Sequence, residues 1–355
     1  MSEQIYKVIG LMSGTSLDGV DLVYVTLEVN GCTNFKIHKA ATIPYSIKWM
    51  ETLKTAFGKT LDQLGQLNED YGKYLASVIN DFIITNNIDE VDFIASHGHT
   101  IFHQPEKGIT VQIGGGQMIA NETGIKTIYD FRTQDVKLGG QGAPLVPIGD
   151  VLLFSDFYYC LNLGGFANIS YDFNGERIAY DICPVNIVMN PIANTLGMPY
   201  DAFGKVARSG EIIPELLDEL NALSFYKEPA PKSLGYEFVV THINPLIEPY
   251  LENVAGVLRT FVEHCAMQIG AQAKSKGNLL VTGGGAFNTF LMERMKVYCA
   301  AQIVIPSDDL VNYKEALIFA LLGVLKLNDK VNCLKSVSGA SKDHSSGVIA
   351  LPEMV

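Results

Sequence analysis

A turn of small polar residues near the N-terminus is the first place where residue types and spacing suggest chemistry. Residues 10–21 read GLMSGTSLDGVD, an apolar run that enters a Ser-Gly-Thr-Ser turn and leaves through Asp18-Gly19. Such a turn can aim backbone N–H groups and hydroxyls at one point, where an anion such as a nucleotide phosphate meets no bulky side chain. It is not a Walker A loop, because no Gly-Lys-Ser/Thr follows and no helix begins directly after it. An ordinary β-hairpin turn explains the segment equally well on its own.

Two further glycine-rich turns have a similar design. Residues 161–170 read LNLGGFANIS, and residues 281–288 read VTGGGAFN, where three glycines precede a helix expected from about Ala286. Glycines beside a helix N-terminus allow close approach of an anionic group, although a tight strand-to-helix turn would account for one or two of them. Two hairpins, one in each half of the chain, could grip a polyphosphate from both sides. The predicted nucleotide contacts in the second half are Gly164, Gly165, Asn168, Gly283, Gly284 and Gly285.

A carboxylate follows the second of these turns. Asp181, in YDICPVN (residues 180–186), falls at the end of the third strand expected in the second half of the chain. A carboxylate at the mouth of a cleft can act as general base on water or on a hydroxyl. The same local sequence also suits a helix N-cap or a strand-end aspartate. General base and structural cap therefore both stay open at this stage.

Three other segments carry polar residues of interest. Arg132 lies in DFRTQDVKLGGQGAPLVP (residues 130–147), which reads either as a substrate-binding crossover that addresses an anion or as an inter-domain hinge. The histidines of SHGHTIFHQP, His97 among them, could chelate zinc or line a cleft, and no carboxylate nearby in sequence completes a metal site. Glu315 lies early in the last expected helix. It either faces a substrate or interacts favourably with the positive N-terminal end of the helix dipole. No metal ligand is predicted.

The elements that must position these residues form a pattern that occurs twice. Each half begins with three β-rich runs joined by short Gly, Asn or Asp connections, followed by alternating helices and strands. The halves share little sequence identity, so the repeat is one of topology. We therefore predict two α/β domains, at residues 1–145 and 146–355, with a ligand in the cleft between them. The expected opening strands are residues 5–12, 20–28 and 35–43 in the first half and 158–163, 167–171 and 177–180 in the second.

Composition narrows the class of protein. The 355 residues suit two domains, 48% are hydrophobic, and the net charge is −12 without a long Lys/Arg run, which argues against nucleic acid and acidic membrane as partners. The six cysteines form no CxxC pair, so neither a zinc site nor a disulfide framework is indicated. The N-terminus lacks the apolar region of a signal peptide, and no apolar stretch reaches the ~18 residues of a membrane span. These features predict a soluble, cytoplasmic protein, and the Ser/Gly-rich C-terminal segment SVSGASKDHSSGVIALPEMV is expected to be irregular.

With these residues in hand, the chain resembles the anhydro-N-acetylmuramic acid kinases across nearly its whole length. The resemblance rests chiefly on GLMSGTSLDGVD and GGQGAPLVP, and extends to SHGHTIFHQP, LNLGGFANIS, KSLGYEF (residues 232–238), VTGGGAFN and KEALIFA (residues 314–320). It implies the fold of the sugar kinase, acetate kinase and actin superfamily: two ribonuclease-H-like (actin-like ATPase) α/β domains around a central nucleotide cleft. That fold agrees with the twofold pattern of strands.

The resemblance also implies an activity and a set of site residues. It implies a cytoplasmic, homodimeric kinase of peptidoglycan recycling that uses ATP, Mg²⁺ and water to convert 1,6-anhydro-N-acetylmuramic acid into N-acetylmuramic acid 6-phosphate. Asp181 matches the catalytic aspartate, while Arg132 and Glu315 match positions near the amino sugar, where we also expect His97. The residues that match the ATP-phosphate loop are Gly14, Thr15, Ser16, Leu17, Asp18, Gly19, Val20 and Asp21.

One segment departs from the family pattern. The catalytic aspartate is usually followed by Thr-Gly-Pro-Gly-Asn, whereas Asp181 is followed by Ile-Cys-Pro-Val-Asn. Val185 cannot easily take a positive φ, so the turn beside Asp181 must differ. Two alternatives to the anhydro-sugar kinase therefore stay open. One is a kinase of the same superfamily with another sugar or a carboxylate as acceptor, and the other is a non-catalytic ATP-binding regulatory module.

Overall fold

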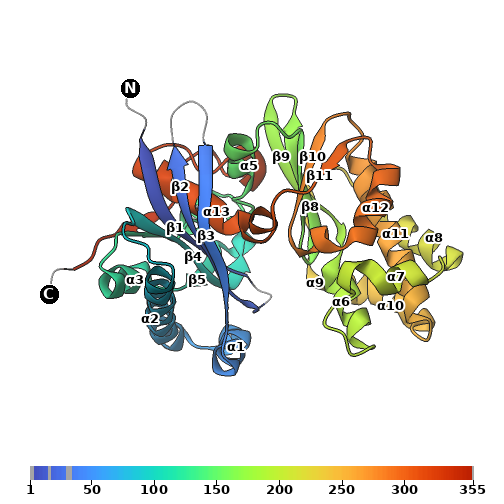
Figure 1. Ribbon diagram of the computed structural model, residues 1–355, viewed down its shortest axis with the longest axis horizontal. Helices are drawn as coiled ribbons and strands as arrows, with labels where there is room; N and C mark the ends of the chain where they lie inside the picture. The colour runs from blue at the N-terminus through green and yellow to red at the C-terminus, as the bar shows by residue number, and fades with distance from the viewer. Residues whose placement is uncertain (1–3, 15–16, 29–33, 354–355) are drawn as a thin grey trace. The chain divides into compact units, whose positions relative to one another are not determined.

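The computed structural model describes residues 4–14, 17–28 and 34–353, which form two compact units (Figure 1). Unit 1 comprises Met1–Leu153 and Tyr313–Val355, and unit 2 comprises Phe154–Asn312. In the described part of the chain, no helix has both the length and the apolar character needed to cross a membrane.

A seven-stranded sheet forms the centre of unit 1. Three strands make an antiparallel meander, β1 (Ile5–Ser13), β2 (Gly19–Glu28) and β3 (Asn34–Pro44). Strand β1 also pairs in parallel with β4 (Phe93–Gln104), and β4 pairs in parallel with β6 (Thr127–Tyr129). The order is β12-β6-β4-β1-β2-β3, and β5 (Ile109–Ile113) pairs with the far part of β4. The last strand, β12 (Val348–Ala350), lies antiparallel to β6.

Helices cover both faces of this sheet because alternate residues of β1 point to opposite sides. Ile9 and Leu11 pack in one core with the apolar stripe of α2 (Leu61–Thr85), whose start carries a Thr60/Gln63 capping box. Gly10 faces the other side, where a Cβ would collide with the Ala316 carbonyl of α13 (Asp308–Leu327). The remaining helices of unit 1 are α1 (Ile47–Lys54), α3 (Gly116–Thr123), α4 (Thr133–Lys137), α5 (Pro147–Leu153) and α14 (Lys335–Ser338).

The close packing of α13 changes the domain division expected from the sequence. A single boundary after residue 145 assigned everything beyond it to the second domain, whereas residues 313–355 belong to unit 1 and the first boundary follows Leu153. Gly323, further along α13, again leaves no room for a side chain, here against Phe93 and Ala95 of β4. Lys314 also forms a buried ion pair with Asp150 of α5, at 2.6 Å. These contacts join α13 to strands and a helix that lie far away in the sequence, so local sequence patterns do not predict them.

Unit 2 contains a five-stranded sheet. An antiparallel meander of β7 (Tyr159–Leu163), β8 (Phe166–Phe173) and β9 (Glu176–Pro184) is followed by β10 (Asn278–Thr282) and β11 (Gln302–Val304), which extend the sheet in parallel from β7. The order is β11-β10-β7-β8-β9. The largely buried helix α11 (Val254–Gln272) packs in the core of this unit. The other helices are α6 (Asn186–Asn194), α7 (Lys205–Ser209), α8 (Pro214–Ala222), α9 (Tyr236–Phe238), α10 (Asn244–Ile247) and α12 (Thr289–Tyr298).

The two sheets repeat one topology. In each, a three-stranded meander is extended from its first strand by two parallel strands, which gives the orders β3-β2-β1-β4-β6 and β9-β8-β7-β10-β11. This is the ribonuclease-H-like arrangement, and the predicted pair of such α/β domains is confirmed. The predicted meander strands differ from the observed ones by a few residues at their ends.

Two local expectations were wrong. The helix after the second glycine run begins at Thr289 and not at Ala286, because a short 3₁₀ turn (Gly284–Phe287) intervenes and the Asn288 side chain caps α12 by accepting from the Leu291 N–H. The C-terminal segment is not wholly irregular, since it contains α14 and β12. Strand β12 forms because Val348–Ala350 pairs with β6, a partner that lies far earlier in the chain.

Candidate functional site

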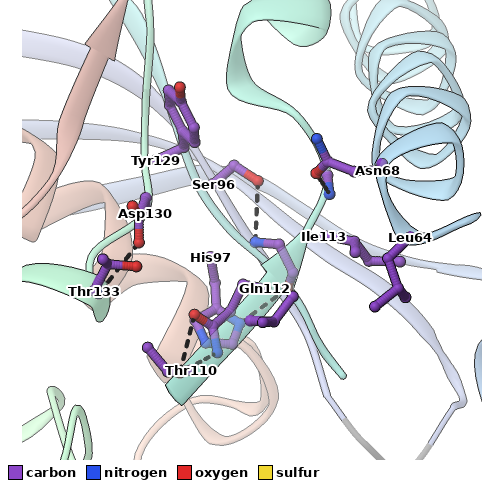
Figure 2. Close-up of a pocket in the computed structure, with 14 residues that line it drawn as sticks. Leu64, Asn68, Ser96, His97, Thr110, Gln112, Ile113, Tyr129, Asp130 and Thr133 are labelled. Atoms are coloured by element: carbon purple, nitrogen blue, oxygen red, sulfur yellow. Dashed lines mark hydrogen bonds between the residues drawn. The ribbon is translucent and has the colours of Figure 1, made fainter. Parts of the chain in front are cut away.

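A pocket of about 340 Å³ lies within unit 1 (Figure 2). Its walls come from α2, the middle of β4, β5 and the segment between β6 and α4. Backbone hydrogen bonds shape it: the Gly98 N–H donates to Ser96 Oγ (3.2 Å), and the Gly114 N–H donates to Asn68 Oδ1 (2.9 Å). The lining residues are Leu64, Gly65, Asn68, Ser96, His97, Gly98, Thr110, Val111, Gln112, Ile113, Gly114, Tyr129, Asp130 and Thr133.

His97 in this pocket is joined directly to Arg132. Arg132 Nε donates to His97 Nε2 at 2.9 Å, so His97 carries its proton on Nδ1, which donates to the Gly98 carbonyl at 2.9 Å. Burial, and next the Arg132 charge, hold the pKa of His97 well below its ordinary value, so the ring is neutral. Arg132 is fixed further because Nη1 donates to the Gly142 carbonyl at 2.7 Å. Both ring nitrogens of His97 therefore have partners within the protein.

Glu315 belongs to the same group of side chains. Burial raises the pKa of Glu315, while nearby Arg132 and Lys314 lower it, and Asp21 raises it further. Burial lowers the pKa of Arg132 to about 10, and Glu315 opposes that shift. The three residues expected near an amino sugar, Arg132, Glu315 and His97, thus come together in unit 1 although Glu315 is distant from the other two in sequence. Together they place a part-buried cation, Arg132, near a part-buried carboxylate, Glu315.

The turn after β1 leaves the sheet beside this group. Ser13 pairs with His99 across β1 and β4, and Ser13 Oγ lies 2.8 Å from His99 Nδ1. The hydroxyls of Tyr45 and Tyr71 also bond to Ser13 Oγ, at 2.6 and 3.0 Å, so the last residue before the turn is held from three sides. Past the turn, Leu17 has φ +62° and its N–H donates to the Gly14 carbonyl (3.4 Å). Thr15 and Ser16 lie outside the described residues.

Asp18 and Asp21 follow this turn. Asp18 is exposed, while Asp21 is part-buried in β2 and accepts a hydrogen bond from Thr42 Oγ1 at 2.6 Å. Burial raises the pKa of Asp21, Thr42 lowers it, and the neighbouring Asp18 charge raises it. Between these carboxylates, Gly19 and Val20 are buried strand residues, and a Cβ at position 19 would strike the Ile43 carbonyl. The expected phosphate loop therefore divides into a segment that ends at the exposed Asp18 and the start of strand β2, which anchors it and carries Asp21.

In unit 2 the two glycine turns lie against each other. Strands β7 and β10 are parallel neighbours, so the turns that follow Leu163 and Thr282 leave the same edge of the sheet. Gly283 has φ +82°, and a Cβ there would lie 2.6 Å from Asn162 Oδ1 and 2.8 Å from the Leu163 carbonyl. A Cβ at Gly285 would similarly meet Leu163, whereas Gly284 and Gly165 are exposed. Gly164, Gly165, Gly283, Gly284 and Gly285 thus form one backbone-lined surface.

Asp181 lies on the third strand of the same sheet. It is the register partner of Asn168, at an irregularity where β9 holds one residue more than β8. Asp181 Oδ2 accepts from the Leu234 N–H at 2.8 Å, and its own N–H donates to the Lys232 carbonyl at 3.0 Å. Burial raises the pKa of Asp181, and the Leu234 N–H opposes the shift. A carboxylate with a raised pKa is the stronger base once ionised.

The residues after Asp181, which depart from the family pattern, form a turn that does not need a positive φ. Val185 keeps a negative φ of −132°, and its N–H donates to the Gly165 carbonyl at 2.7 Å. Helix α6 then begins at Asn186. The turn is therefore tied to the first glycine turn of unit 2 without any positive φ in Pro184, Val185 or Asn186.

Several residues of the unit 1 pocket were not singled out from the sequence. Asn68, Gln112 and Tyr129 are spread over three elements, and nothing in their local sequence marks them. Asp130 carried a usable signal, because it directly precedes a helix-forming stretch. It takes φ +54° and its Oδ1 accepts from the Thr133 N–H at the start of α4 (3.2 Å).

Comparisons with known proteins bear on this arrangement. A family model described as anhydro-N-acetylmuramic acid kinase matches residues 6–352. A protein of that name from Vibrio cholerae is 35% identical over 97% of this chain and 98% of its own length. Another from Aliivibrio fischeri is 38% identical, again over 97% of this chain and 98% of its own length.

Among solved structures, the activator of the 2-hydroxyisocaproyl-CoA dehydratase from Clostridium difficile, determined with bound ADPNP, aligns with a TM-score of 0.42 and 14% identity. The alignment covers 89% of this chain and 93% of that one.

Proposed function

Since the chain belongs to the anhydro-N-acetylmuramic acid kinase family, we infer that it is an ATP-dependent sugar kinase that opens 1,6-anhydro-N-acetylmuramic acid with water and phosphorylates O6. The product is N-acetylmuramic acid 6-phosphate, as expected of an enzyme of peptidoglycan recycling. The observation that carries the inference is the family match from residue 6 to residue 352. The geometry of Asp181 and of the glycine turns agrees with that chemistry.

We assign Asp181 as the general base. Ionised, its carboxylate accepts a proton from a water whose oxygen attacks the anomeric carbon, and the bond from that carbon to O6 breaks. The released O6 then attacks the γ-phosphorus, and ADP leaves. The raised pKa of Asp181 and its fixed hydrogen bond to the Leu234 N–H support this role, because they give a basic carboxylate held in one orientation.

Nucleotide phosphates are assigned to the turns. In unit 2 the assigned residues are Gly164, Gly165, Gly283, Gly284, Gly285 and the Asn168 side chain, where the exposed Gly165 and Gly284 offer N–H donors with no Cβ in the way. The N–H groups of Gly164 and Gly283 already donate to the carbonyls of Phe166 and Val311. In unit 1 the same role is assigned to Gly14 through Asp21, Thr15 and Ser16 included. Donors fixed before the reaction stabilise the charge that develops on phosphoryl oxygens without reorganisation.

Mg²⁺ fits the carboxylates that follow the unit 1 turn. Asp18 raises the pKa of Asp21, so two carboxylates repel each other at a place where hard oxygen ligands are exposed or part-buried. One or two carboxylates with substrate phosphates are the usual protein environment of this ion. We therefore assign Asp21 and Asp18 to hold it, and when bound it supplies charge compensation to the phosphates.

The amino sugar is assigned to Arg132, Glu315 and His97. Arg132 is already oriented by His97 Nε2 and the Gly142 carbonyl, so its remaining donors are pre-organised for an anionic group such as the sugar's carboxylate. Because His97 is held neutral, it serves to orient Arg132 and adds no second charge. Glu315 is assigned to sugar hydroxyls.

A product assay with the purified chain tests the proposed function. With ATP, Mg²⁺ and 1,6-anhydro-N-acetylmuramic acid, we expect ADP and the 6-phosphosugar in equal amounts. ADP formation with another sugar or a carboxylate, but not with the anhydro-sugar, would favour the other kinase of the superfamily. ATP binding without product from any acceptor would favour the regulatory module.

The family resemblance also supports a homodimer and a cytoplasmic location. Sedimentation of the purified chain checks the first, since a single species at the monomer mass would contradict it. Fractionation of the source cells checks the second.

A further inference from the structure

Three metal-ligating side chains meet inside unit 1, close to Arg132 but distinct from the residues assigned above. Asp135 comes from α4, while Cys333 and His344 come from the C-terminal segment. One ligand atom of each, a carboxylate oxygen, the thiol sulfur and an imidazole nitrogen, lies within 4.8 Å of the other two. The exposed fraction of each residue is at most 5%. The sequence offered no hint of this group, because Asp135 is far from the other two in the chain.

The backbone holds Cys333 and His344 side by side. Each N–H donates to the other residue's carbonyl, at 3.1 and 3.2 Å, which is an isolated antiparallel bridge. Directly opposite residues in such a pair project their side chains to the same side. Asn332 anchors the bridge, since its Nδ2 donates to the carbonyls of Leu322 and Ser346 and its Oδ1 accepts from the Ser346 N–H. The positions of the Cys333 and His344 side chains are thus set by backbone hydrogen bonds and by Asn332.

His344 presents an unused lone pair to the group. Its Nδ1 donates to the Lys342 carbonyl at 3.1 Å, while its buried Nε2 has no hydrogen-bond partner among the residues that the structure describes. Nε2 lies 3.5 Å from Asp135 Oδ1, with a geometry outside that of a hydrogen bond. Two tetrahedral zinc ligands at their usual bond lengths are about 3.3 Å apart. The spacing therefore suits two ligands of one ion better than two partners in a hydrogen bond.

We propose that Asp135, Cys333 and His344 bind one divalent transition-metal ion, with Zn²⁺ as the best match. A thiolate, an imidazole and a carboxylate form the mixed sulfur, nitrogen and oxygen set that Zn²⁺ accepts, whereas Mg²⁺ and Ca²⁺ take oxygen ligands. Three protein ligands leave one tetrahedral position for water. This site is separate from the Mg²⁺ assigned to Asp18 and Asp21.

The surroundings of the three ligands resemble the supporting shell of a metal centre. The Nδ1–H of His344 donates to a carbonyl, which fixes the tautomer with Nε2 available. Asp135 is oriented through both oxygens, because Ser338 Oγ donates to Oδ1 and the Gly142 N–H donates to Oδ2, each at 2.7 Å. These bonds hold the carboxylate in place before an ion arrives.

Binding must displace the thiol proton. Only the thiolate binds a metal ion, so coordination replaces the S–H bond of Cys333 by a metal–sulfur bond while one proton passes to solvent. Affinity should rise with pH for that reason.

The ion would join α4 to the C-terminal segment. Helix α4 begins directly after Arg132, so a bond from Asp135 to Cys333 and His344 would brace the residue assigned to the sugar's anionic group. A structural role follows, and metal loading should raise the melting temperature of the whole chain.

Titration of the metal-free full chain with Co²⁺ tests the proposal independently of kinase activity. We expect a sulfur-to-cobalt charge-transfer band that saturates at one ion per chain, is displaced by Zn²⁺ and strengthens with pH. Cys333→Ser should abolish the band, and His344→Gln should weaken affinity at least about 100-fold. The matched controls are Cys299→Ser, a part-buried thiol of unit 2, and His38→Gln, an exposed histidine of β3, and both should leave the band unchanged.

The opposing account is a plain ion pair between a protonated His344 and Asp135. Absence of the band in the wild-type chain, or a band that Cys299→Ser removes and His344→Gln does not, would overturn the metal proposal. Should Cys333→Ser fail to fold, His344→Gln with its retained sulfur still decides between the two accounts.

Discussion

The two sheets carry different side chains at equivalent positions. In each sheet we compare one row, meaning three residues that pair across the three strands of the meander. In unit 1 the row across the meander is Met12–Asp21–Thr42, and in unit 2 it is Asn162–Asn168–Asp181. The carboxylate stands on the second strand in unit 1 and on the third strand in unit 2. Burial raises the pKa of both.

What holds each carboxylate differs as well. Asp21 is bound by a side chain of its own sheet, Thr42 Oγ1. Asp181 is bound by the Leu234 N–H, from the segment that precedes α9, outside the sheet. A repeated backbone topology thus fixes where each row lies, and single side chains decide which role we propose for it. This supports different assignments for Asp21 and Asp181 despite their similar burial.

The largest expected effect is a loss of kcat on changing Asp181, the carboxylate of the unit 2 row. Asp181→Asn keeps the size and the acceptor for the Leu234 N–H but removes the base, so kcat should fall by about 10²–10⁴-fold while ATP still binds. Steady-state kinetics and nucleotide titration measure both quantities. Asp172→Asn, a change at a mostly exposed carboxylate of the neighbouring strand β8, is the control and should leave kcat unchanged. Full activity of Asp181→Asn would refute the assignment.

The next effect concerns Gly283, a tightly packed glycine in the second glycine turn of unit 2. Gly283→Ala combines φ +82° with contacts of 2.6 and 2.8 Å, so the free energy of unfolding should fall by about 2–4 kcal/mol and ATP affinity with it. Gly175→Ala is a close control, because its φ is +84° and nothing lies within 4 Å, and it should cost about 1 kcal/mol. Urea unfolding measures the difference, and equal losses would show that packing against Leu163 contributes nothing.

A smaller effect follows from the raised pKa of Asp181. A carboxyl that binds its proton more tightly in the folded chain makes the free energy of unfolding fall as pH rises from 3.8 through the folded pKa. At neutral pH that loss is complete, so Asp181→Asn should melt at a higher temperature than the wild type. The difference should shrink as the pH falls toward 4. Melting curves at several pH values test this, and a lower melting temperature at neutral pH would contradict it.

The smallest effect is expected in the row of unit 1. Thr42→Val removes the hydroxyl that bonds Asp21, so the pKa of Asp21 should rise further and the KM for ATP should increase by about fivefold, the equivalent of about 1 kcal/mol. Thr26→Val, elsewhere on β2, removes a hydroxyl that bonds the exposed His38 and serves as the control. An unchanged KM for ATP in Thr42→Val would contradict a role of Asp21 in nucleotide binding.

The local sequence predicted the meander strands of both units, but it did not predict the contacts between segments distant in sequence. The meander strands were predicted because apolar runs alternate with short polar connections, which are local signals. The return of α13 to unit 1 was missed, since it depends on Gly10 of β1 facing α13 and on Gly323 of α13 facing β4, contacts between segments distant in sequence. The start of α12 at Thr289 was missed although Asn288, a strong N-cap residue, was visible.

The candidate site shows the same division. The glycine turns and Asp181 could be predicted as site residues because each lies on or directly after a recognisable strand, and that prediction stands as a proposal. The bond between Arg132 and His97 and the group of Asp135, Cys333 and His344 were not predicted, because they join segments that only the folded chain brings together. Cysteine spacing in particular argued against a metal site, since that test detects only ligands that are close in sequence.

The account depends most on the claim that water, activated by Asp181, attacks the sugar and not the phosphorus. A single turnover in ¹⁸O-labelled water, followed by mass spectrometry of the product, tests this directly. We predict one ¹⁸O at the anomeric position and none in the phosphoryl group, with no labelled product from Asp181→Asn on the same time scale. Label in the phosphoryl group, or labelled sugar formed by Asp181→Asn at the wild-type rate, would contradict it.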